Sequence, residues 1–395
     1  MEPVQPLEGT TVLAVEQAVA VPYATRLLAD LGARVIKVER PGGGDFARGY
    51  DTACGTVSSY FAWVNLGKES ITLDLKHPDG RAVLDRLLER ADVVLCNLSP
   101  AAAGRLGLTA DALRAERPGL IVGELSGYGE QGPYAGRKAY DALIQSEAGL
   151  IELTGEGEVT GRAGISVADI AAGVQLHAAV LAALLRKGRT GEGATLRLTL
   201  LEALAEWMHQ PMLYATGTGN IPPRTGAHHA SIAPYGPFRC GDGQSVHLAV
   251  QNDGQWRRLC AVTGQRELAE DPRFTTVAGR VAARPELHAE LQPAFDRTSA
   301  AELLAALDAA DVPAARTRTV LDLAEHPQLE VRDRWAEVPV PDNRTVRMLR
   351  PPVDDSGSAW TPGTVPDLGE HTDLVLDWLG YHPEEINNLR QTGVV

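Results

Sequence analysis

The amino-acid sequence predicts an α/β protein whose large domain is a doubly wound, Rossmann-like parallel sheet. Short apolar segments typical of buried strands alternate with helix-like segments over about the first 130 residues, which is the pattern of successive β-α-β units. The composition then shifts after residue 218 to a loop-like stretch dense in Pro, Gly and His. Finally, 395 residues exceed what one hydrophobic core usually supports, so a second domain is expected.

The predicted elements of the sheet follow one another closely along the chain. A strand at 10–16, a helix at 22–32 and a strand at 33–39 form the first β-α-β unit. Further strands are predicted at 70–75, 92–97 and 120–129, with helices at 78–91 and 109–119. Ligands of such sheets bind beyond the carboxyl ends of the strands. The polar residues that follow those ends are therefore candidate binding residues, namely Gln17, Arg40, Asn97 and Ser126.

The sequence contains no clear signature of a nicotinamide or flavin site. Glu39 ends the second strand, as the ribose-binding acid of dinucleotide folds does, but the segment after the first strand reads QAVAVP and lacks the required glycines. The stretch GYGEQG at 127–132 matches G-x-G-x-x-G, yet Pro133 follows it and no helix opens there. The loop GGGD at 42–45 lacks the ending of a phosphate-binding P-loop. We therefore expect neither cofactor.

The chain is expected to leave the large domain and later return to it. After a helix at 200–217 comes the loop-like stretch 220–238. A strand at 244–250 and helices at about 254–262, 285–296 and 299–310 follow, and a last helix is predicted at 367–380. The predicted boundaries are 1–218 and 331–395 for the large domain and 219–330 for a smaller α+β domain.

Composition and charge restrict the classes of partner. A net charge of -14 argues against nucleic acid and anionic membranes, so any anionic ligand needs local Lys and Arg residues. The four cysteines show no C-x-x-C spacing, and no His, Asp or Glu set has the spacing of a metal site. The N-terminal residues MEPVQPLEG do not resemble a signal peptide, and the apolar helix at 170–185 is too short for a membrane span. We expect a cytoplasmic, metal-free protein.

That apolar helix carries a carboxylate, Asp169, at its start. The segment is rich in Ala and Leu nearly all round, which indicates burial, and Gly188 and Gly191 end it. The helix dipole would keep Asp169 ionised. Two interpretations remain open on these residues alone: an ordinary N-cap, or a nucleophilic or basic carboxylate on a rigid element.

Several segments resemble class III CoA-transferases, a family that includes formyl-CoA transferases, carnitine CoA-transferases and 2-methylacyl-CoA racemases. They are PLEGTTVLAVEQAVAVPYATRLLADLGARVIKVERPGGGD, NLGKESITLDLKHPDGRAVLDRLLERADVVLCN, SGYGEQGPYAGRKAYDALIQSEAGL, SVADIAAGVQLHAAVLAALLRKGRTGEG and LGEHTDLVLDWLG. The likeness covers nearly the whole chain in the family's order. It implies that Asp169 attacks an acyl-CoA thioester, giving an aspartyl anhydride and then an aspartyl-CoA thioester. It also implies an interlocked homodimer.

The resemblance also implies residues that bind coenzyme A. The cations at the family's CoA-contacting positions are Arg40, Lys68, Arg105 and Lys138. The residues that match positions lining the pantetheine and adenine cleft are Gln17, Ala18, Asn97 and Leu98. Without the resemblance, each Lys or Arg is more simply a solvated surface charge.

Tyr140 and Asp141 bear on the type of reaction. The resemblance implies a second carboxylate at Asp141, which is otherwise a helix-opening acid stabilised by the dipole. The similar racemases place a His one residue before this acid, as the second base for proton exchange at the α-carbon. This chain has Tyr140 there, and a phenol with a pKa of about 10 is a poor base. Transfer is therefore favoured over racemisation.

The small domain departs from the glycine-rich loop of some members of the family. The comparable stretch at 226–236 resembles that of members acting on small dicarboxylic acids such as succinate, glutarate or mesaconate. His228 or His229 is a candidate to bind the distal carboxylate, and an exposed loop histidine is the equally open alternative. His77 and His209 are expected to be structural. We expect a CoA-transferase that moves CoA from an acyl-CoA donor to a small carboxylate acceptor, the rivals being a racemase and a non-catalytic CoA-binding protein.

Overall fold

The computed structural model describes residues 5–353, 355 and 360–395, and the chain divides into two compact units. Unit 1 comprises residues 1–148, 163–209 and 329–395, of which the structure describes the part just given. Unit 2 comprises residues 149–162 and 210–328. The segment 149–162, which the sequence places in the large domain, thus belongs with the second unit.

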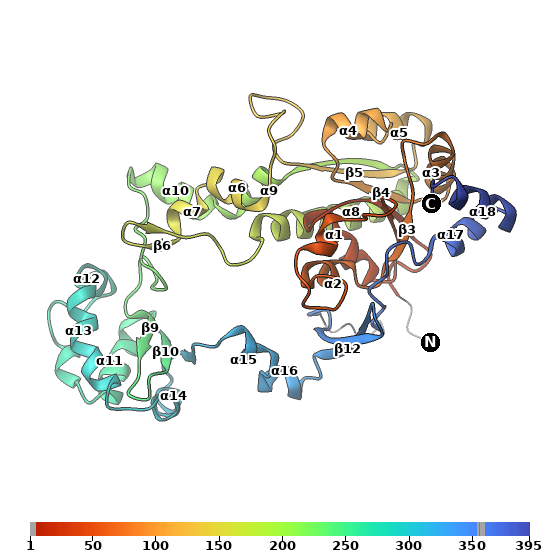
Figure 1. Ribbon diagram of the computed structural model, residues 1–395. Helices are drawn as coiled ribbons and strands as arrows, with labels where there is room; N and C mark the ends of the chain where they lie inside the picture. The colour runs from red at the N-terminus through yellow and green to blue at the C-terminus, as the bar shows by residue number, and fades with distance from the viewer. Residues whose placement is uncertain (1–4, 354, 356–359) are drawn as a thin grey trace. The chain divides into compact units, whose positions relative to one another are not determined.

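Unit 1 is built on a six-stranded parallel sheet (Figure 1). Its strands are β1 (Thr11–Val15), β2 (Arg34–Glu39), β3 (Glu69–Thr72), β4 (Val93–Cys96), β5 (Ile121–Ser126) and β8 (Ala194–Thr199). They lie in the order β3-β2-β1-β4-β5-β8, so Val12 of β1 pairs with Val35 on one side and with Val93 on the other. Strand order reverses between β1 and β4, which is where ligands bind in doubly wound sheets. The predicted α/β class with a parallel sheet is confirmed.

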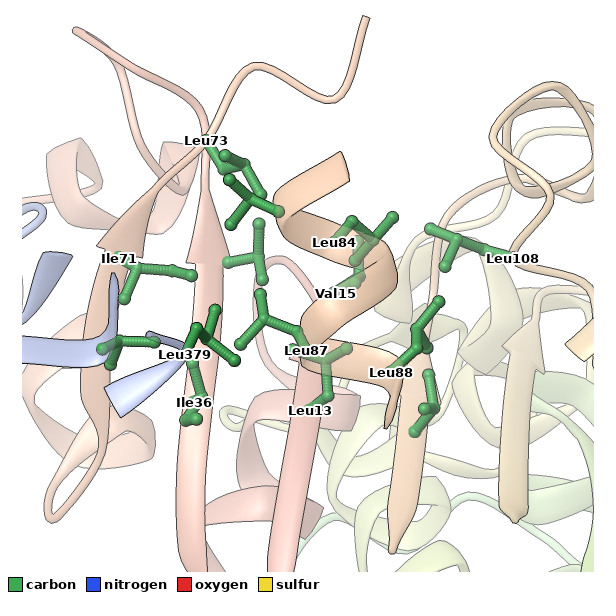
Figure 2. Packing of buried hydrophobic residues seen from close by; sticks show 14 of the residues in the cluster. Leu13, Val15, Ile36, Ile71, Leu73, Leu84, Leu87, Leu88, Leu108 and Leu379 are labelled. Atoms are coloured by element: carbon green, nitrogen blue, oxygen red, sulfur yellow. The ribbon is translucent and has the colours of Figure 1, made fainter. Parts of the chain in front are cut away.

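One face of the sheet is covered by helices from both ends of the chain. They are α3 (Pro78–Arg90), α4 (Pro100–Arg105), α5 (Ala110–Glu116), α17 (Thr372–Trp378) and α18 (Pro383–Gln391). Figure 2 shows Leu13, Ile36 and Ile71 of three neighbouring strands packed with Leu84, Leu87 and Leu88 of α3. His77 caps the start of α3 and is structural, as expected, because its ring accepts the Asp79 N–H at 3.2 Å. The C-terminal return of the chain therefore completes this core.

The opposite face is covered by α1 (Ala20–Ala29) and α8 (Val167–Thr190), with α6 (Asp141–Glu147) and α9 (Leu200–Trp207) packed against α8. Gly173 permits the close approach of α8 to α1, since a Cβ there would lie 2.8 Å from the Ala20 carbonyl oxygen. Asp169 lies one turn before Gly173, so both residues are on the same side of α8. The packing thus directs the first turn of α8 towards the start of α1.

The rest of unit 1 packs beside this sheet. A short helix, η1 (Phe46–Gly49), precedes α2 (Ser59–Asn65), which packs against an antiparallel hairpin of β12 (Trp335–Val340) and β13 (Arg344–Leu349). Val57, Phe61 and Leu66 share a small core there with Val338 and Val340.

Unit 2 has its own sheet and core. The antiparallel sheet has the order β11-β10-β9, with β9 (Tyr235–Arg239), β10 (Ser245–Ala249) and β11 (Ala314–Arg316). Its helices include α11 (Asp253–Val262), α12 (Val277–Ala282), α13 (Arg284–Phe295) and α14 (Ala300–Ala309). Trp256, Phe274 and Phe295 are buried at the centre. The shorter elements are α7 (Leu150–Leu153), β6 (Gly155–Glu156), β7 (Val159–Thr160), α10 (His209–Thr218), η2 (Arg266–Ala269) and α15 (Val320–Ala324), and α16 (Pro327–Val331) leads back to unit 1.

Several elements differ from the sequence prediction. β8, β9, α2, α12 and α18 were not predicted, and the single helix predicted at 200–217 is two helices, of which α10 buries none of its residues. α8 is longer than predicted: it has 24 residues and ends at Gly191, which adopts a left-handed conformation. By length and composition alone α8 could cross a membrane, so the argument from shortness was wrong. In this structure it packs against α1, β5, β8 and α9 as a core helix does.

Candidate active site

A cavity of about 800 Å³ lies at the carboxyl ends of β1, β2, β3 and β4. Its walls are largely apolar and include Leu73, Leu75 and Leu106. The cations among its lining residues are Arg40, Lys76 and Arg105. A large cavity with apolar walls and a few cations suits an elongated ligand that carries phosphates, because phosphates need cations while aromatic and alkyl parts need apolar contact.

Four of the residues predicted to bind coenzyme A are among the lining residues, namely Gln17, Arg40, Leu98 and Arg105. Lys76 was missed, although it lies just past the end of β3, where the same rule that selected Arg40 would have found it. Glu39 also lines the cavity, and it accepts hydrogen bonds from Arg48 at 2.7 Å and from Ser70 at 2.6 Å. Glu39 is therefore held by protein groups in a buried ion pair.

Lys68, which was predicted to contact coenzyme A, is not among the lining residues of the cavity. Lys68 is 2% exposed and donates to Glu16, to the Pro22 carbonyl and to Asn65 at 2.7–3.0 Å, so its three ammonium protons already have acceptors. Burial lowers the pKa of Lys68 to about 7, although Glu16 acts in the opposite direction. The predicted contact of Lys68 with coenzyme A does not fit this geometry.

Asn97 and Ala18 belong to the support of the cavity. The Asn97 side chain accepts the Gln17 N–H at 2.9 Å and donates to the Gln17 carbonyl at 2.8 Å. Ala18 follows with a φ of 64°. Lys138 is exposed on the segment before α6, outside the lining of the cavity. The structure therefore brings four of the eight predicted CoA-binding residues into the lining. Ala18 lies in the turn that carries Gln17, and Asn97 bonds to that turn.

Asp169 is the third residue of α8, and Ser166 is the N-cap, so the N-cap interpretation of Asp169 was wrong. The carboxyl is half-buried. Burial, followed by the charge of Asp141, raises the pKa of Asp169 to about 7. This direction is opposite to the one expected from the helix dipole. A carboxyl with a pKa near neutrality can alternate between a neutral and a nucleophilic state at physiological pH.

Asp141 accepts two hydrogen bonds, one from the first turn of α8 and one from its own helix, α6. Its Oδ1 accepts the Ala168 N–H at 2.8 Å, and its Oδ2 accepts from the Gln145 side chain at 2.7 Å. Gln145, which the sequence did not indicate, also accepts the Ala163 N–H at 2.9 Å. Asp141 is also the first residue of α6, so the helix-opening interpretation holds together with its position beside Asp169.

Aromatic residues gather near these carboxyls. Tyr140 is the N-cap residue of α6 and is 62% exposed. Tyr50 packs against Tyr60 with ring centroids 5.6 Å apart. Burial and then the charges of Asp45, Asp169 and other neighbours raise the pKa of Tyr50 to about 12. Tyr50 was missed by the sequence analysis because nothing in its local pattern indicates that it lies close enough to Asp169 for the charge to affect its pKa.

We expect Asp141→Asn to move the pH profile of the reaction. The kcat/KM for acyl-CoA should rise with pH through an inflection near 7, because only ionised Asp169 is a nucleophile. Asparagine keeps an acceptor for the Ala168 N–H but removes the neighbouring charge, so the inflection should shift to lower pH by roughly 0.5–1 unit. The control is Glu147→Gln on the same helix, which should leave the inflection in place. An unchanged inflection in Asp141→Asn would show that the two carboxyls do not interact.

The two candidate histidines lie in unit 2 and line a cavity of about 620 Å³ there. His228 is half-buried, with its ring centroid 4.5 Å from that of His288. Burial lowers the pKa of His228, so it is neutral at pH 7. His229 is exposed and packs against Tyr235 with ring centroids 5.1 Å apart. His209, the first residue of α10, is also exposed, and its ring bonds to the carbonyl of Glu206 in α9.

All four cysteines are free. Within residues 5–353, 355 and 360–395, no three His, Cys, Asp or Glu side chains gather in a way that could hold a metal ion.

The sequence and structure match proteins of one family. Residues 7–372 match CoA-transferase family III. The chain is 34% identical to a succinate–glutarate CoA-transferase of Agrobacterium fabrum, over 94% of this chain and 95% of that protein. It is 35% identical to an acetyl-CoA:oxalate CoA-transferase of Acetobacter aceti, over 84% of this chain and 86% of that protein.

Among solved structures, a CaiB/BaiF family protein from Brucella suis superimposes with a TM-score of 0.86 at 34% identity, covering 95% of this chain and 99% of the other. The fold of the chain is thus shared with a CaiB/BaiF family protein over nearly the whole length of both. The chain belongs to CoA-transferase family III and is a CoA-transferase.

Proposed function

We propose that the protein moves CoA from an acyl-CoA thioester to a small dicarboxylic acid, with Asp169 as the covalent nucleophile. The observation that carries the proposal is the position of Asp169. Asp169 stands in the first turn of α8. Gly173 of the same helix allows α8 to pack closely against the start of α1. The turn that precedes α1 carries Gln17, which lines the cavity. The cavity supplies apolar walls for pantetheine and adenine and cations for the phosphates of coenzyme A.

The proposed reaction proceeds by four exchanges at carbonyl carbons. The Asp169 carboxylate attacks the thioester carbonyl, and the CoA thiolate leaves, which gives a mixed anhydride. The thiolate then attacks the Asp169 carbonyl, releasing the donor acid and forming the aspartyl-CoA thioester. The acceptor carboxylate attacks that thioester and again expels the thiolate. A final attack of the thiolate on the acceptor's carbonyl gives the new acyl-CoA and restores Asp169.

The raised pKa of Asp169 supports this role. A half-buried carboxylate beside Asp141 loses less solvation on attack than a fully hydrated one, and it is ionised in about half of the molecules near pH 7. Tyr50 remains protonated because its pKa is about 12, so its hydroxyl can donate a hydrogen bond near the reacting groups. No proton has to be removed from carbon in any step.

The choice of a dicarboxylic acceptor is supported by the relatives, whose names specify succinate, glutarate and oxalate. Within unit 2, His228 and His229 line a cavity that could bind a distal carboxylate. A panel of acyl-CoA donors against mono- and dicarboxylate acceptors, read by mass spectrometry of the CoA thioesters, tests this choice. Equal rates for acetate and for glutarate would contradict it.

The proposal also includes a homodimer of interlocked chains in the cytoplasm. Support for a second copy comes from exposed apolar side chains on one side of α8, Val174 and Leu185, and from Trp207 at the end of α9. Free thiols are compatible with a reducing compartment. Light scattering coupled to gel filtration measures the mass, and a single-chain mass of 42.1 kDa would contradict the dimer.

We expect no exchange of the α-proton of a chiral 2-methylacyl-CoA. Racemisation needs a base on each face of the α-carbon, and the residue before Asp141 is Tyr140, an exposed phenol rather than an imidazole. The measurement is deuterium incorporation in deuterated water without an acceptor acid, read by mass spectrometry. Rapid incorporation together with loss of chirality would identify a racemase and overturn the transferase proposal.

A further inference from the structure

Four charged side chains lie buried at the cavity, and we name them the buried charge cluster: Glu16, Lys37, Asp45 and Lys68. Glu16 and Asp45 are among the lining residues of the cavity, and Lys37 and Lys68 are not. Glu16 follows β1, Lys37 stands within β2, and Asp45 and Lys68 directly precede η1 and β3. Each is at most 2% exposed. Charged groups are costly to bury unless each is paired and its remaining hydrogen-bonding capacity is used, so such a cluster requires a reason.

The four side chains of the cluster form hydrogen bonds and ion pairs with one another. Lys68 Nζ donates to Glu16 Oε1 at 2.7 Å, and Lys37 Nζ lies 3.4 Å from the same oxygen. Lys37 Nζ also donates to Asp45 Oδ2 at 2.9 Å. Thr25 donates to the other oxygen of Glu16 at 2.8 Å. Two acidic side chains and two lysines therefore form a chain of contacts that links four segments of unit 1.

The buried charge cluster is hydrogen-bonded to the backbone of the Gln17–Ala18 turn. Asp45 Oδ1 accepts the Ala18 N–H at 3.1 Å, and Glu16 immediately precedes the turn. On the other side, Asn97 bonds both the N–H and the carbonyl of Gln17. Ala18 has a φ of 64°, a conformation that alanine adopts only when its surroundings hold it there. The turn is thus fixed from two sides.

We propose that the buried charge cluster is a positioning device that fixes the Gln17–Ala18 turn, and that Lys68 acts through this turn and does not touch coenzyme A. The turn carries Gln17 into the lining of the cavity and leads into α1, the helix against which the first turn of α8 is packed. Loss of the cluster therefore disturbs the wall of the cavity at Gln17. The identity of the ligand in this inference depends on the proposed function.

The first test needs no ligand. Hydrogen exchange of the peptide covering residues 16–21 reports on the N–H groups of Gln17 and Ala18 in the free protein. In Lys68→Met, exchange should accelerate about tenfold or more in this peptide and stay unchanged along β5. Glu16→Gln/Lys68→Met removes both charges of one pair, so no uncompensated buried charge remains to prevent folding, and it should show the same local effect.

The matched control is Arg34→Met. Arg34 also stands on β2 and pairs with Glu69 at 2.8 Å, but it lies at the opposite end of the strand from the cavity. Its loss should lower thermal stability without accelerating exchange at 16–21. Unchanged exchange at 16–21 in both Lys68 variants, or equal acceleration in Arg34→Met, overturns the positioning device.

The second test separates positioning from a general loss of stability. Titration with free coenzyme A should show about tenfold weaker binding for Lys68→Met and for Gln17→Ala, and the double variant should be no weaker than either alone. Such non-additivity means that both changes act through one element. Asn97→Ala should couple to Gln17→Ala in the same way, whereas Arg34→Met should be additive.

The two tests fail for different reasons. Additive effects of Lys68→Met and Gln17→Ala would overturn the route through the turn. If the wild-type protein binds no coenzyme A, the proposed function fails, and the exchange measurement still decides whether the cluster fixes the turn.

Discussion

Asp169→Ala should abolish CoA transfer, lowering kcat by at least about 10³-fold, while the affinity for coenzyme A stays within about threefold of the wild-type value. The proposed covalent route has no alternative once the carboxyl is gone, because every exchange passes through the Asp169 carbonyl. The binding cavity is formed by the ends of β1 to β4 and does not include Asp169 among its lining residues, so binding should survive. Steady-state turnover and calorimetric titration of CoA measure the two effects.

The control is Glu302→Ala. Glu302 occupies the same helical position, third in α14, but lies in unit 2. It should lose stability with its capping box and retain turnover. A positive test is hydroxylamine trapping during turnover, which should modify Asp169 only when acyl-CoA is present. Normal turnover by folded Asp169→Ala would remove it from the mechanism.

The raised pKa of Asp169 should also make the folding stability of the protein depend on pH. Folding raises the pKa of Asp169 from an ordinary value of 3.8 to about 7, so stability that depends on the protonated carboxyl is complete below about pH 4 and is lost as the pH rises through 7. Asn cannot ionise. Asp169→Asn should therefore be more stable than the wild type at pH 8, by about 1–2 kcal/mol after allowance for the exposed part of the side chain, and not at pH 4. The stability lost above pH 7 is thus the free energy of holding the ionised Asp169 carboxylate in the folded protein.

Much of the sheet could be predicted because its signals are local. The strands β1 (TVLAV) and β4 (VVLC) are apolar runs buried on both faces, and β2 and β5 are buried over most of their length. The helix α3 carries its own start signal at Pro78. β8 was missed because ATLRLT follows directly on a long helix, and its strand character depends on pairing with β5, about seventy residues earlier in the chain. The predicted length of α8 was too short because the last two turns of the helix are exposed and basic, unlike its apolar first part.

The chemistry of single charges could not be predicted in the same way. The sequence around Lys68 reads NLGKES, which is typical of a surface turn, yet the side chain is buried on Glu16, 52 positions away. The pKa of Asp169 depends on Asp141, which is 28 residues away in sequence, and on burial by elements that no window contains. Arg40 was correctly predicted to line the cavity, because that prediction needed only its position directly after a strand.

The double variant Arg40→Ala/Arg105→Ala should bind coenzyme A about 100-fold or more weakly at low salt, and the loss should shrink at high salt. Both side chains line the cavity and both are exposed at its rim. A hydrogen bond between charged groups contributes roughly 1.5–3 kcal/mol, so two lost phosphate contacts account for a factor of this size. The remaining cation of the lining, Lys76, would keep some affinity. Because the net charge of the protein is -14, distant charges oppose the ligand and cannot substitute for the two arginines.

Calorimetric titration at about 0.05 M and 0.5 M salt measures the effect, since the screening length falls from more than about 10 Å to a few ångströms over this range. Arg189→Ala/Arg297→Ala provides a control with the same change of net charge at two exposed positions outside the lining, and it should alter affinity by less than about twofold. Titration with 3′-dephospho-CoA assigns the contacts: the single variant that has lost the contact to the 3′-phosphate should no longer distinguish the two ligands. If the dissociation constant of the double variant matches that of the control at both salt concentrations, the phosphates of coenzyme A do not bind at Arg40 and Arg105.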